Sequence, residues 1–207
     1  METLTTPLPM IIPRNLVLEE MDGQPIYYRG YRDVLNGEKT IEEITGSSVF
    51  KSYLVSLLLS RLKLRLPKRM FFVLSNEAGL HLRRGTNLNN DIALIRRERL
   101  SNLFSDKYLD VAPDIAIEVD TKADFSEGMS ESEYYKKKTQ HLLDFGVQKV
   151  IWVNTKTQQI QIAERGQPAW TLTTWDADVA VVEGCLFNLN HLLTEDGAIG
   201  SNPVLAG

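Results

Sequence analysis

The sequence predicts an α/β or α+β fold, in which a mixed β-sheet packs against helices, and three observations lead to this class. Two stretches, 48–65 and 130–145, have apolar residues at the three-four spacing of helices. Short apolar runs typical of strands lie before, between and after them. The chain has 207 residues, 43% of them hydrophobic, which is enough to bury one core. We therefore expect a single domain over 1–207, with loose termini at 1–13 and 197–207.

The N-terminal part is predicted to contain hairpins followed by a helix. Asp-Gly at 22–23 and Asn-Gly at 36–37 are turn dipeptides between β-prone runs, which indicates antiparallel strands. Ser47 or Ser48 is a suitable N-cap for a helix that continues to about Arg65.

Strands are expected in the middle of the chain. The runs are MFFVL (70–74), LHLR (80–83), DIALI (91–95) and DIAIEV (114–119), with a turn at SNEAG (75–79). DIALI and DIAIEV are similar in sequence and are predicted to be neighbouring strands of one sheet.

The C-terminal part is predicted to hold a helix, a buried strand and further antiparallel strands. Ser130 and Glu133 have the spacing of a capping box, and Gly146 fits the position after the end of a helix over 130–145. VIWVN then forms a buried strand, and QIQIAER, AWTLTTW and VAVVEG alternate like antiparallel strands before a short helix near HLL.

Composition limits the classes of protein and partner. A formal net charge of −4 argues against generic, high-affinity binding of nucleic acid, which needs many cations on phosphates. The single cysteine, Cys185, cannot form an intramolecular disulfide and fits a reducing compartment. The first residues lack the features of a signal peptide, and no apolar run approaches the ~18 residues of a membrane span. We expect a cytoplasmic protein with no membrane partner.

The stretch APDIAIEVDTK, residues 112–122, has charged side chains on one face of a predicted strand. Successive side chains of a strand point to opposite faces. One face holds Ile115, Ile117, Val119 and Thr121, and the other holds Asp114, Ala116, Glu118, Asp120 and Lys122. The first face can anchor a core, whereas the second gathers three carboxylates and a lysine.

Further charged groups are predicted to join this acidic face. Asp91 begins the preceding strand, and we expect it at the same register as Asp114. Converging carboxylates suit a hard cation such as Mg²⁺ or Mn²⁺, whereas the alternative is a salt-bridged strand edge without a ligand. Lys138 lies on the apolar stripe of the second helix, where it either pairs with these acids or extends over apolar surface.

These pieces together resemble a known group of proteins. The matching pieces are YRDVLNGE (31–38), NNDIALIRRE (89–98), APDIAIEV (112–119) and KTQHLLDFGVQKVIWVN (138–154). Their order resembles the PD-(D/E)XK restriction-endonuclease-like superfamily, and within it a family of bacterial proteins described as putative restriction endonucleases. The resemblance spans roughly residues 30 to 190. It implies a restriction-endonuclease-like sheet flanked by helices, with N-terminal hairpins and extra C-terminal antiparallel strands.

The resemblance also implies roles for single residues. Asp91 matches the first metal ligand, Glu118 the second, and Lys138 a helical lysine that takes the place of the lysine in the motif Glu-x-Lys. Asp33 matches the place of an outer or additional ligand. Asp114 matches the aspartate that opens the third strand, and either binds metal or caps the strand.

The chain departs from the family pattern after Glu118. The lysine place of Glu-x-Lys is occupied by Asp120, a further candidate ligand. Lys122, two residues later on the same face, either substitutes for that lysine or pairs with Asp120.

We expect a Mg²⁺- or Mn²⁺-dependent endonuclease, with DNA a better candidate than RNA. Catalysis would involve Asp91, Glu118 and Lys138, with Lys122 as a further candidate. The alternative is a catalytically degenerate module that binds or regulates, and a phosphoesterase of small nucleotides is a third reading. Proteins of this fold often act as dimers, so a homodimer is expected by analogy.

Overall fold

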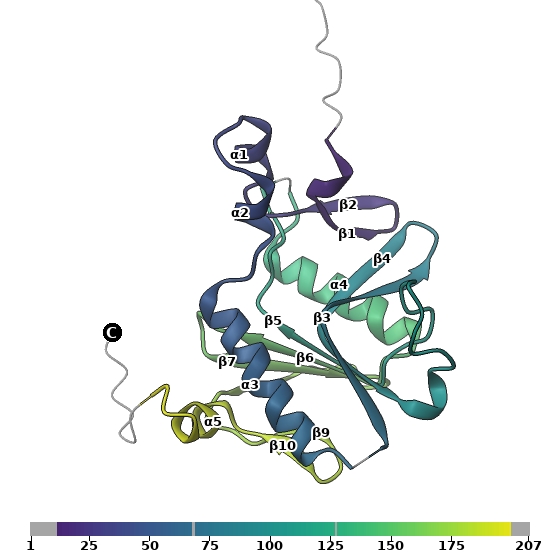
Figure 1. The fold of residues 1–207 in the computed structure, drawn as a ribbon, viewed down its shortest axis with the longest axis vertical. Helices are drawn as coiled ribbons and strands as arrows, with labels where there is room; N and C mark the ends of the chain where they lie inside the picture. The colour runs from purple at the N-terminus through teal and green to yellow at the C-terminus, as the bar shows by residue number, and fades with distance from the viewer. Residues whose placement is uncertain (1–11, 68, 127, 200–207) are drawn as a thin grey trace, which may run out of the picture.

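The computed structural model describes residues 12–67, 69–126 and 128–199. An eight-stranded, mostly antiparallel sheet lies at the centre, and helices cover both of its faces (Figure 1). The strands are β1 (Val17–Met21), β2 (Gln24–Tyr27), β3 (Phe71–Arg83), β4 (Thr86–Arg96), β5 (Ile115–Val119), β6 (Lys149–Asn154), β7 (Gln159–Glu164) and β8 (Thr171–Thr174). The helices are α1 (Tyr31–Leu35), α2 (Ile41–Thr45), α3 (Val49–Arg65), α4 (Glu131–Phe145) and α5 (Leu189–Glu195), besides 3₁₀ turns at Arg14–Leu16 and Arg97–Arg99.

The path of the sheet is β2-β1-β4-β5-β6-β7-β8, with β3 also paired to β4. Among the paired strands of the described residues, only β5 and β6 run parallel, and α4 is the crossover between them. A separate two-stranded sheet contains β9 (Val179–Val182) and β10 (Cys185–Phe187). The expected mixed sheet with flanking helices and extra C-terminal strands is therefore confirmed. The termini expected to be loose lie largely outside the described residues.

The first predicted hairpin is confirmed and the second is wrong. Asp22 and Gly23 connect β1 to β2, which are antiparallel. Asn36 and Gly37 instead follow helix α1, and the Gly37 amide bonds back to the Val34 carbonyl. A helix end and a hairpin turn both use residues that tolerate positive φ, so the same dipeptide serves either structure.

The two long helices begin where their capping residues predict. The Ser48 hydroxyl accepts from the amide of Lys51 at the start of α3. Ser130 and Glu133 form the complete capping box of α4, and Gly146 follows that helix at a φ of 125°. None of the helices within the described residues is long and apolar enough to cross a lipid bilayer.

Strand β3 is longer than predicted. The expected turn at 75–79 is wrong, because β3 continues through it as a bulge. Asn76 and Glu77 have φ values of 66° and 56°, and the register against β4 shifts between Ser75 and Ala78. A bulge residue in the left-handed region leaves the same signature as a turn. The actual turn, at Gly85, leads into β4.

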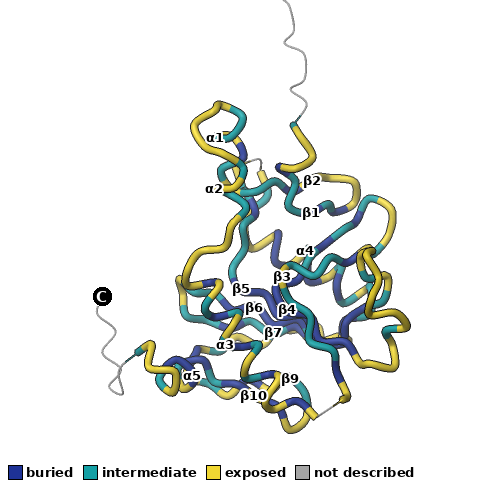
Figure 2. Tube along the Cα trace, viewed as in Figure 1, coloured by how far each residue is buried: buried dark blue, intermediate teal, exposed yellow. Residues whose placement is uncertain are grey.

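Two hydrophobic clusters lie on opposite faces of the sheet. Ile115, Ile117 and Val119 of β5 pack with the leucines of α3, whereas Ala116 packs with Tyr134 and other residues of α4. The predicted alternation of β5 is confirmed, and Figure 2 shows that its surroundings are the most buried part of the molecule. Both faces of the central strands are covered, so a charged side chain there needs a partner.

Candidate functional site

The site lies where β4 passes from one neighbouring strand to the next. Strand β3 pairs along one edge of β4, while β1 and β5 share the other edge. Strand β1 pairs at Asn87 and β5 pairs at residues 92–94, which leaves a gap between them. Backbone groups in such a gap need other partners. Carboxylates supply them here: Glu19 accepts from the amide of Asn89 at 3.0 Å, and Asp91 from the amide of Val119 at 2.8 Å.

Asp91 is held by a lysine from the helix on one face of the sheet. Its Oδ1 lies 2.9 Å from Lys51 Nζ, and both side chains are buried. Asp91 and Asp114 stand at the same place in two similar sequences, but they are not neighbours in the sheet. Strands β4 and β5 are antiparallel, and Ile92 pairs with Ile117. The expectation that Asp91 and Asp114 share a register is wrong, and Asp91 lies at the Glu118 end of β5.

Glu118 is held by a lysine from the other face. Lys138 Nζ of α4 lies 3.2 Å from Glu118 Oε2 and 2.8 Å from Glu19 Oε1. Tyr134 donates its hydroxyl to the other oxygen of Glu19 at 2.8 Å, and Asn90 donates its side-chain amide to Glu118. Of the two readings of Lys138, pairing with the acids is confirmed, and Glu19 is an additional partner.

Burial and charge set the protonation of this cluster. Burial raises the pKa of Glu118 to about 7, and the negative charges of Asp91 and Glu19 add to the rise, while Lys138 opposes it. Burial alone would lower the pKa of Lys138, but the carboxylates of Glu118 and Glu19 outweigh it and raise that pKa well above its ordinary value. Lys138 therefore remains a cation at every pH near neutrality.

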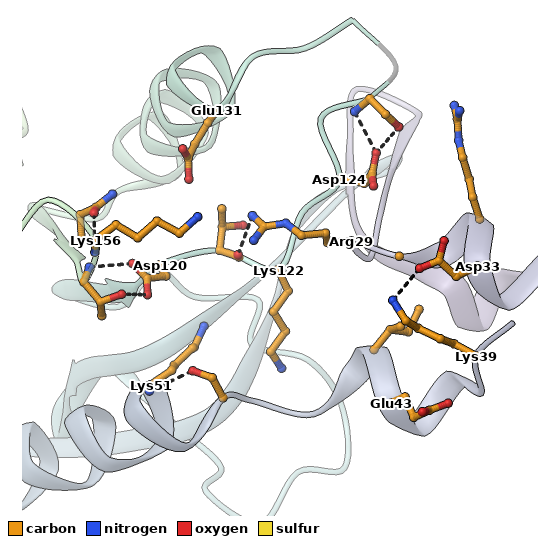
Figure 3. A pocket seen from close by; sticks show the side chains of 18 residues that line it. Arg29, Asp33, Lys39, Glu43, Lys51, Asp120, Lys122, Asp124, Glu131 and Lys156 are labelled. Carbon is orange, nitrogen blue, oxygen red and sulfur yellow. Dashed lines mark hydrogen bonds and ion pairs between the residues drawn. The ribbon is translucent and has the colours of Figure 1, made fainter.

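A small cavity connects these groups to a larger cleft. The cavity, of about 10 Å³, is lined by Asp91, Glu118 and Lys138 among others, and has room for about one water molecule. Lys51, Lys122, Asp120 and Thr121 line both this cavity and the open cleft outside it, which Figure 3 shows from close by. The buried acids thus lie at the inner end of a cleft that solvent can enter.

Lys122 and Asp120 lie near the acids but contact other groups. Lys122 donates to Glu77, in the bulge of β3, and to the carbonyl of Thr45 at 2.8 Å. Asp120 has a φ of 51° and accepts from the amide of Thr155 at 2.8 Å. Lys122 therefore does not pair with Asp120, and Asp120 shapes the turn after β6.

Two predicted ligands lie away from the cavity. Asp114, at the other end of β5, accepts from the amide of Arg96 at 2.8 Å and also contacts the side chain of Arg99. Asp33 lies at the outer part of the cleft, paired with Lys39 at 2.6 Å. The structure separates both from Asp91 and Glu118.

The residues at the cavity suit a hard cation that takes only a few of its ligands from the protein. Across residues 12–67, 69–126 and 128–199, no three His, Cys, Asp or Glu side chains converge to hold a metal ion by themselves. Mg²⁺, however, usually keeps several waters and takes one or two carboxylates together with substrate phosphates. Asp91 and Glu118 provide two. Asn90 donates to Glu118, and its Oδ1 is buried without a hydrogen-bond partner in the described part of the chain, but Asn90 does not line the cavity.

Sequence reasoning missed Glu19 and Lys51. Glu19 is one of two adjacent glutamates in a strand, and its pairing with Lys138 spans most of the chain. Lys51 did give a signal, because it follows the same helical stripe as Leu54, Leu58 and Leu62. A lysine on such a stripe needs a carboxylate partner, and the argument that identified Lys138 applies to Lys51 as well.

Comparisons with known proteins agree with this architecture. A crystal structure titled a putative nuclease belonging to DUF820, from Anabaena variabilis, aligns with a TM-score of 0.58 at 18% identity. The alignment covers 85% of this chain and 89% of that chain, and it shows a shared restriction-endonuclease-like fold. No curated protein matches the chain. A family model described as "Putative restriction endonuclease" matches residues 33–193, so the chain belongs to the Uma2 family.

Proposed function

We propose that this protein is a Mg²⁺- or Mn²⁺-dependent nuclease that hydrolyses phosphodiester bonds of DNA. One observation carries the proposal: Asp91 and Glu118, from adjoining strands, line a single cavity beside an open cleft, and Lys51 and Lys122 line both. The bound cation would polarise the scissile phosphate and neutralise charge that develops on it. Membership of the family supports a nuclease, and nucleic acid as the substrate.

The side chains around the cavity have separate tasks in this proposal. Asp91 and Glu118 hold the cation, and the backbone amide of Val119 fixes one oxygen of Asp91. Lys138 is enclosed between Glu19 and Glu118, so it positions the Glu118 carboxylate. Lys51 and Lys122 line both cavity and cleft, and are therefore the lysines placed to contact the phosphate or to assist the attacking water.

A cleavage assay with matched variants tests the proposal. Purified wild type should cut a plasmid or a labelled DNA fragment only when Mg²⁺ or Mn²⁺ is added, and Glu118→Gln should lose this activity. Asp114→Asn is the control, because it removes one carboxylate from the other end of the same strand. Equal cleavage by wild type and Glu118→Gln would mean that the activity comes from another site or from a contaminant.

One observation favours a second function, a module that has lost catalysis and binds or regulates. Both carboxylates proposed to hold the cation already have a lysine, Lys51 at Asp91 and Lys138 at Glu118, so each has a cationic partner without a metal. Calorimetric titration with Mn²⁺ separates the two functions. Heat of binding that disappears in Glu118→Gln supports the nuclease, whereas no heat at millimolar Mn²⁺ supports the module. The expected homodimer stays a prediction in both cases.

A further inference from the structure

A second pocket, called here the side pocket, borders the cavity at the gap between β1 and β5. It lies over β1, β2 and β4 and is distinct from the cleft, with which it shares none of its described lining residues. Leu18 and Asn89 line both the side pocket and the cavity of Asp91 and Glu118. A ligand in the side pocket would therefore lie next to the proposed cation site.

One wall of the side pocket is the ring of Tyr108, in the segment between β4 and β5. Backbone hydrogen bonds hold this segment on β3: the Leu109 amide donates to the Gly79 carbonyl at 2.9 Å, and the His81 amide to the Leu109 carbonyl at 2.8 Å. A Cβ on Gly79 would lie 2.8 Å from Cδ1 and Cε1 of Tyr108 and 2.9 Å from its Cγ, which is closer than a Cβ can approach a ring. Three consecutive ring atoms at nearly one distance mean that the ring lies flat on Gly79. Glycine inside a strand marks such a close approach, so the position of the ring is specified by the strand beneath it.

Tyr108 is fixed on one side and open on the other. It is 61% exposed, although its segment is bonded to the sheet. A second ring of the side pocket, Tyr27, is held in a similar way, because it stacks on Tyr31 with 4.7 Å between the ring centroids. Rings that are held in place and keep a free face suit a flat ligand that stacks on them.

The charges of the side pocket favour an uncharged ligand over a phosphate. Its described lining has one cation, Arg14, and two carboxylates, on Glu19 and Glu20. Glu19 has its lysine partner, Lys138, outside the lining, and Glu20 accepts from the side-chain amide of Asn87 at 3.3 Å. A nucleobase is flat and uncharged, and the exocyclic amino group of cytosine donates to a carboxylate such as that of Glu20.

We propose that the side pocket holds an unpaired nucleobase, stacked on the ring of Tyr108, while an adjoining phosphate of the same strand reaches the cavity of Asp91 and Glu118. The proposal rests on the proposed function and deepens it, because it assigns a base-binding residue outside the cleft. Stacking on an aromatic side chain is open to every base, since every base has a π-face. The base comes from a single strand or is extruded from a duplex, and both sources present the same ring.

Binding without catalysis tests the proposal. Fluorescence anisotropy is measured in EDTA for two labelled strands of equal length, oligo-dC and an abasic strand with the same sugars and phosphates. Wild type should bind oligo-dC more tightly than the abasic strand. Tyr108→Ala should lose about fivefold or more in affinity for oligo-dC, whereas Tyr108→Phe, which keeps the ring, should bind like wild type. For the abasic strand, wild type and Tyr108→Ala should be equal, because the variant removes only a contact to a base.

Phe104→Ala is the matched control for Tyr108→Ala. Phe104 is an aromatic residue of the same segment and is 94% exposed, but it does not line the side pocket. Its replacement should leave the affinity for oligo-dC unchanged. A blunt duplex run in parallel identifies the source of the base: dependence on Tyr108 for oligo-dC alone indicates a single strand, and dependence for the duplex as well indicates extrusion.

Three results would overturn the proposal. They are equal or undetectable binding of the two strands by wild type, equal affinity of wild type and Tyr108→Ala for oligo-dC, and the same loss for Tyr108→Ala on the abasic strand. A loss for Tyr108→Phe as large as that for Tyr108→Ala would also overturn it, since the hydroxyl and not the ring would then make the contact. The outcome is separable from that of the proposed function. Tyr108-dependent binding by a protein that never cleaves with Mn²⁺ supports the base site and refutes the nuclease, whereas cleavage without that dependence does the reverse.

Discussion

Replacement of Lys138 by methionine should destabilise the protein strongly and in a pH-dependent way. Lys138 Nζ lies 2.8 Å from one buried carboxylate, on Glu19, and 3.2 Å from another, on Glu118. At an effective dielectric constant of about 20, each contact provides about 5–6 kcal/mol of gross attraction. The cost of removing the ammonium group from water offsets most of this. What remains after the substitution is two carboxylates buried without a cation, and we expect a loss of about 3–5 kcal/mol in the free energy of unfolding.

The loss should grow as the pH rises. Burial already raises the pKa of Glu118 to about 7, and Lys138 opposes that rise, so the pKa of Glu118 in Lys138→Met should be higher still. A buried acid with a raised pKa is uncharged and tolerated at low pH, and it destabilises the fold as the pH passes through its pKa. The raised pKa of Lys138 keeps its contribution to the wild type fully present below about pH 10.5.

Urea unfolding followed by tryptophan fluorescence measures both effects, at about pH 6.5 and about pH 9. Lys136→Met is the matched control, because Lys136 lies on the exposed side of the same helix, and it should change stability by less than about 0.5 kcal/mol. A loss below about 1 kcal/mol for Lys138→Met, or the same loss at both pH values, would refute the reasoning that Lys138, Glu19 and Glu118 form a buried, charged unit.

Three further predictions address the cavity and the helix that carries Lys138. Lys51→Met should bind Mn²⁺ about tenfold more tightly in calorimetry, because the amine no longer competes for Asp91; unchanged or weaker affinity contradicts this. Ser130→Ala removes the N-cap of α4 and should lower the free energy of unfolding by about 1 kcal/mol and Tm by about 2–4 °C. Ser132→Ala changes a residue in the first turn that is not the cap, and it should lose little. Asp114→Asn should leave Mn²⁺ binding unchanged, and a loss of binding would place Asp114 among the ligands after all.

The fold was predictable where the signals are local. The capping residues Ser48 and Ser130 located both long helices, and the alternation of β5 gave its two faces correctly. The failures occurred where one local signal serves several structures. Asn76 and Glu77 have turn-like backbone conformations inside a continuous strand, since a bulge needs the same left-handed residues as a turn.

The site was predictable only in part, because its partners are distant in sequence. Glu118 and Lys138 were paired correctly by the rule that a buried cation needs an acid. The same rule could not choose Glu19 over the adjacent Glu20, since only the gap in the pairing of β4 makes the Glu19 carboxylate necessary. Asp114 was misplaced because single-sequence patterns do not reveal whether two adjacent strands run parallel or antiparallel.

Lys51 and Lys138 determine how α3 and α4 are aligned along the sheet. They project from α3 and α4, which cover opposite faces, and each inserts one amine toward the same central strands. Leucine and tyrosine contacts tolerate a shift along the helix axis, but a slip of one turn, about 5.4 Å, would withdraw the amine from its carboxylate. Each misaligned packing would then leave a charged side chain buried among apolar residues without its partner. The charged cluster thus selects one alignment for both layers of the molecule, whatever ligand the cavity binds.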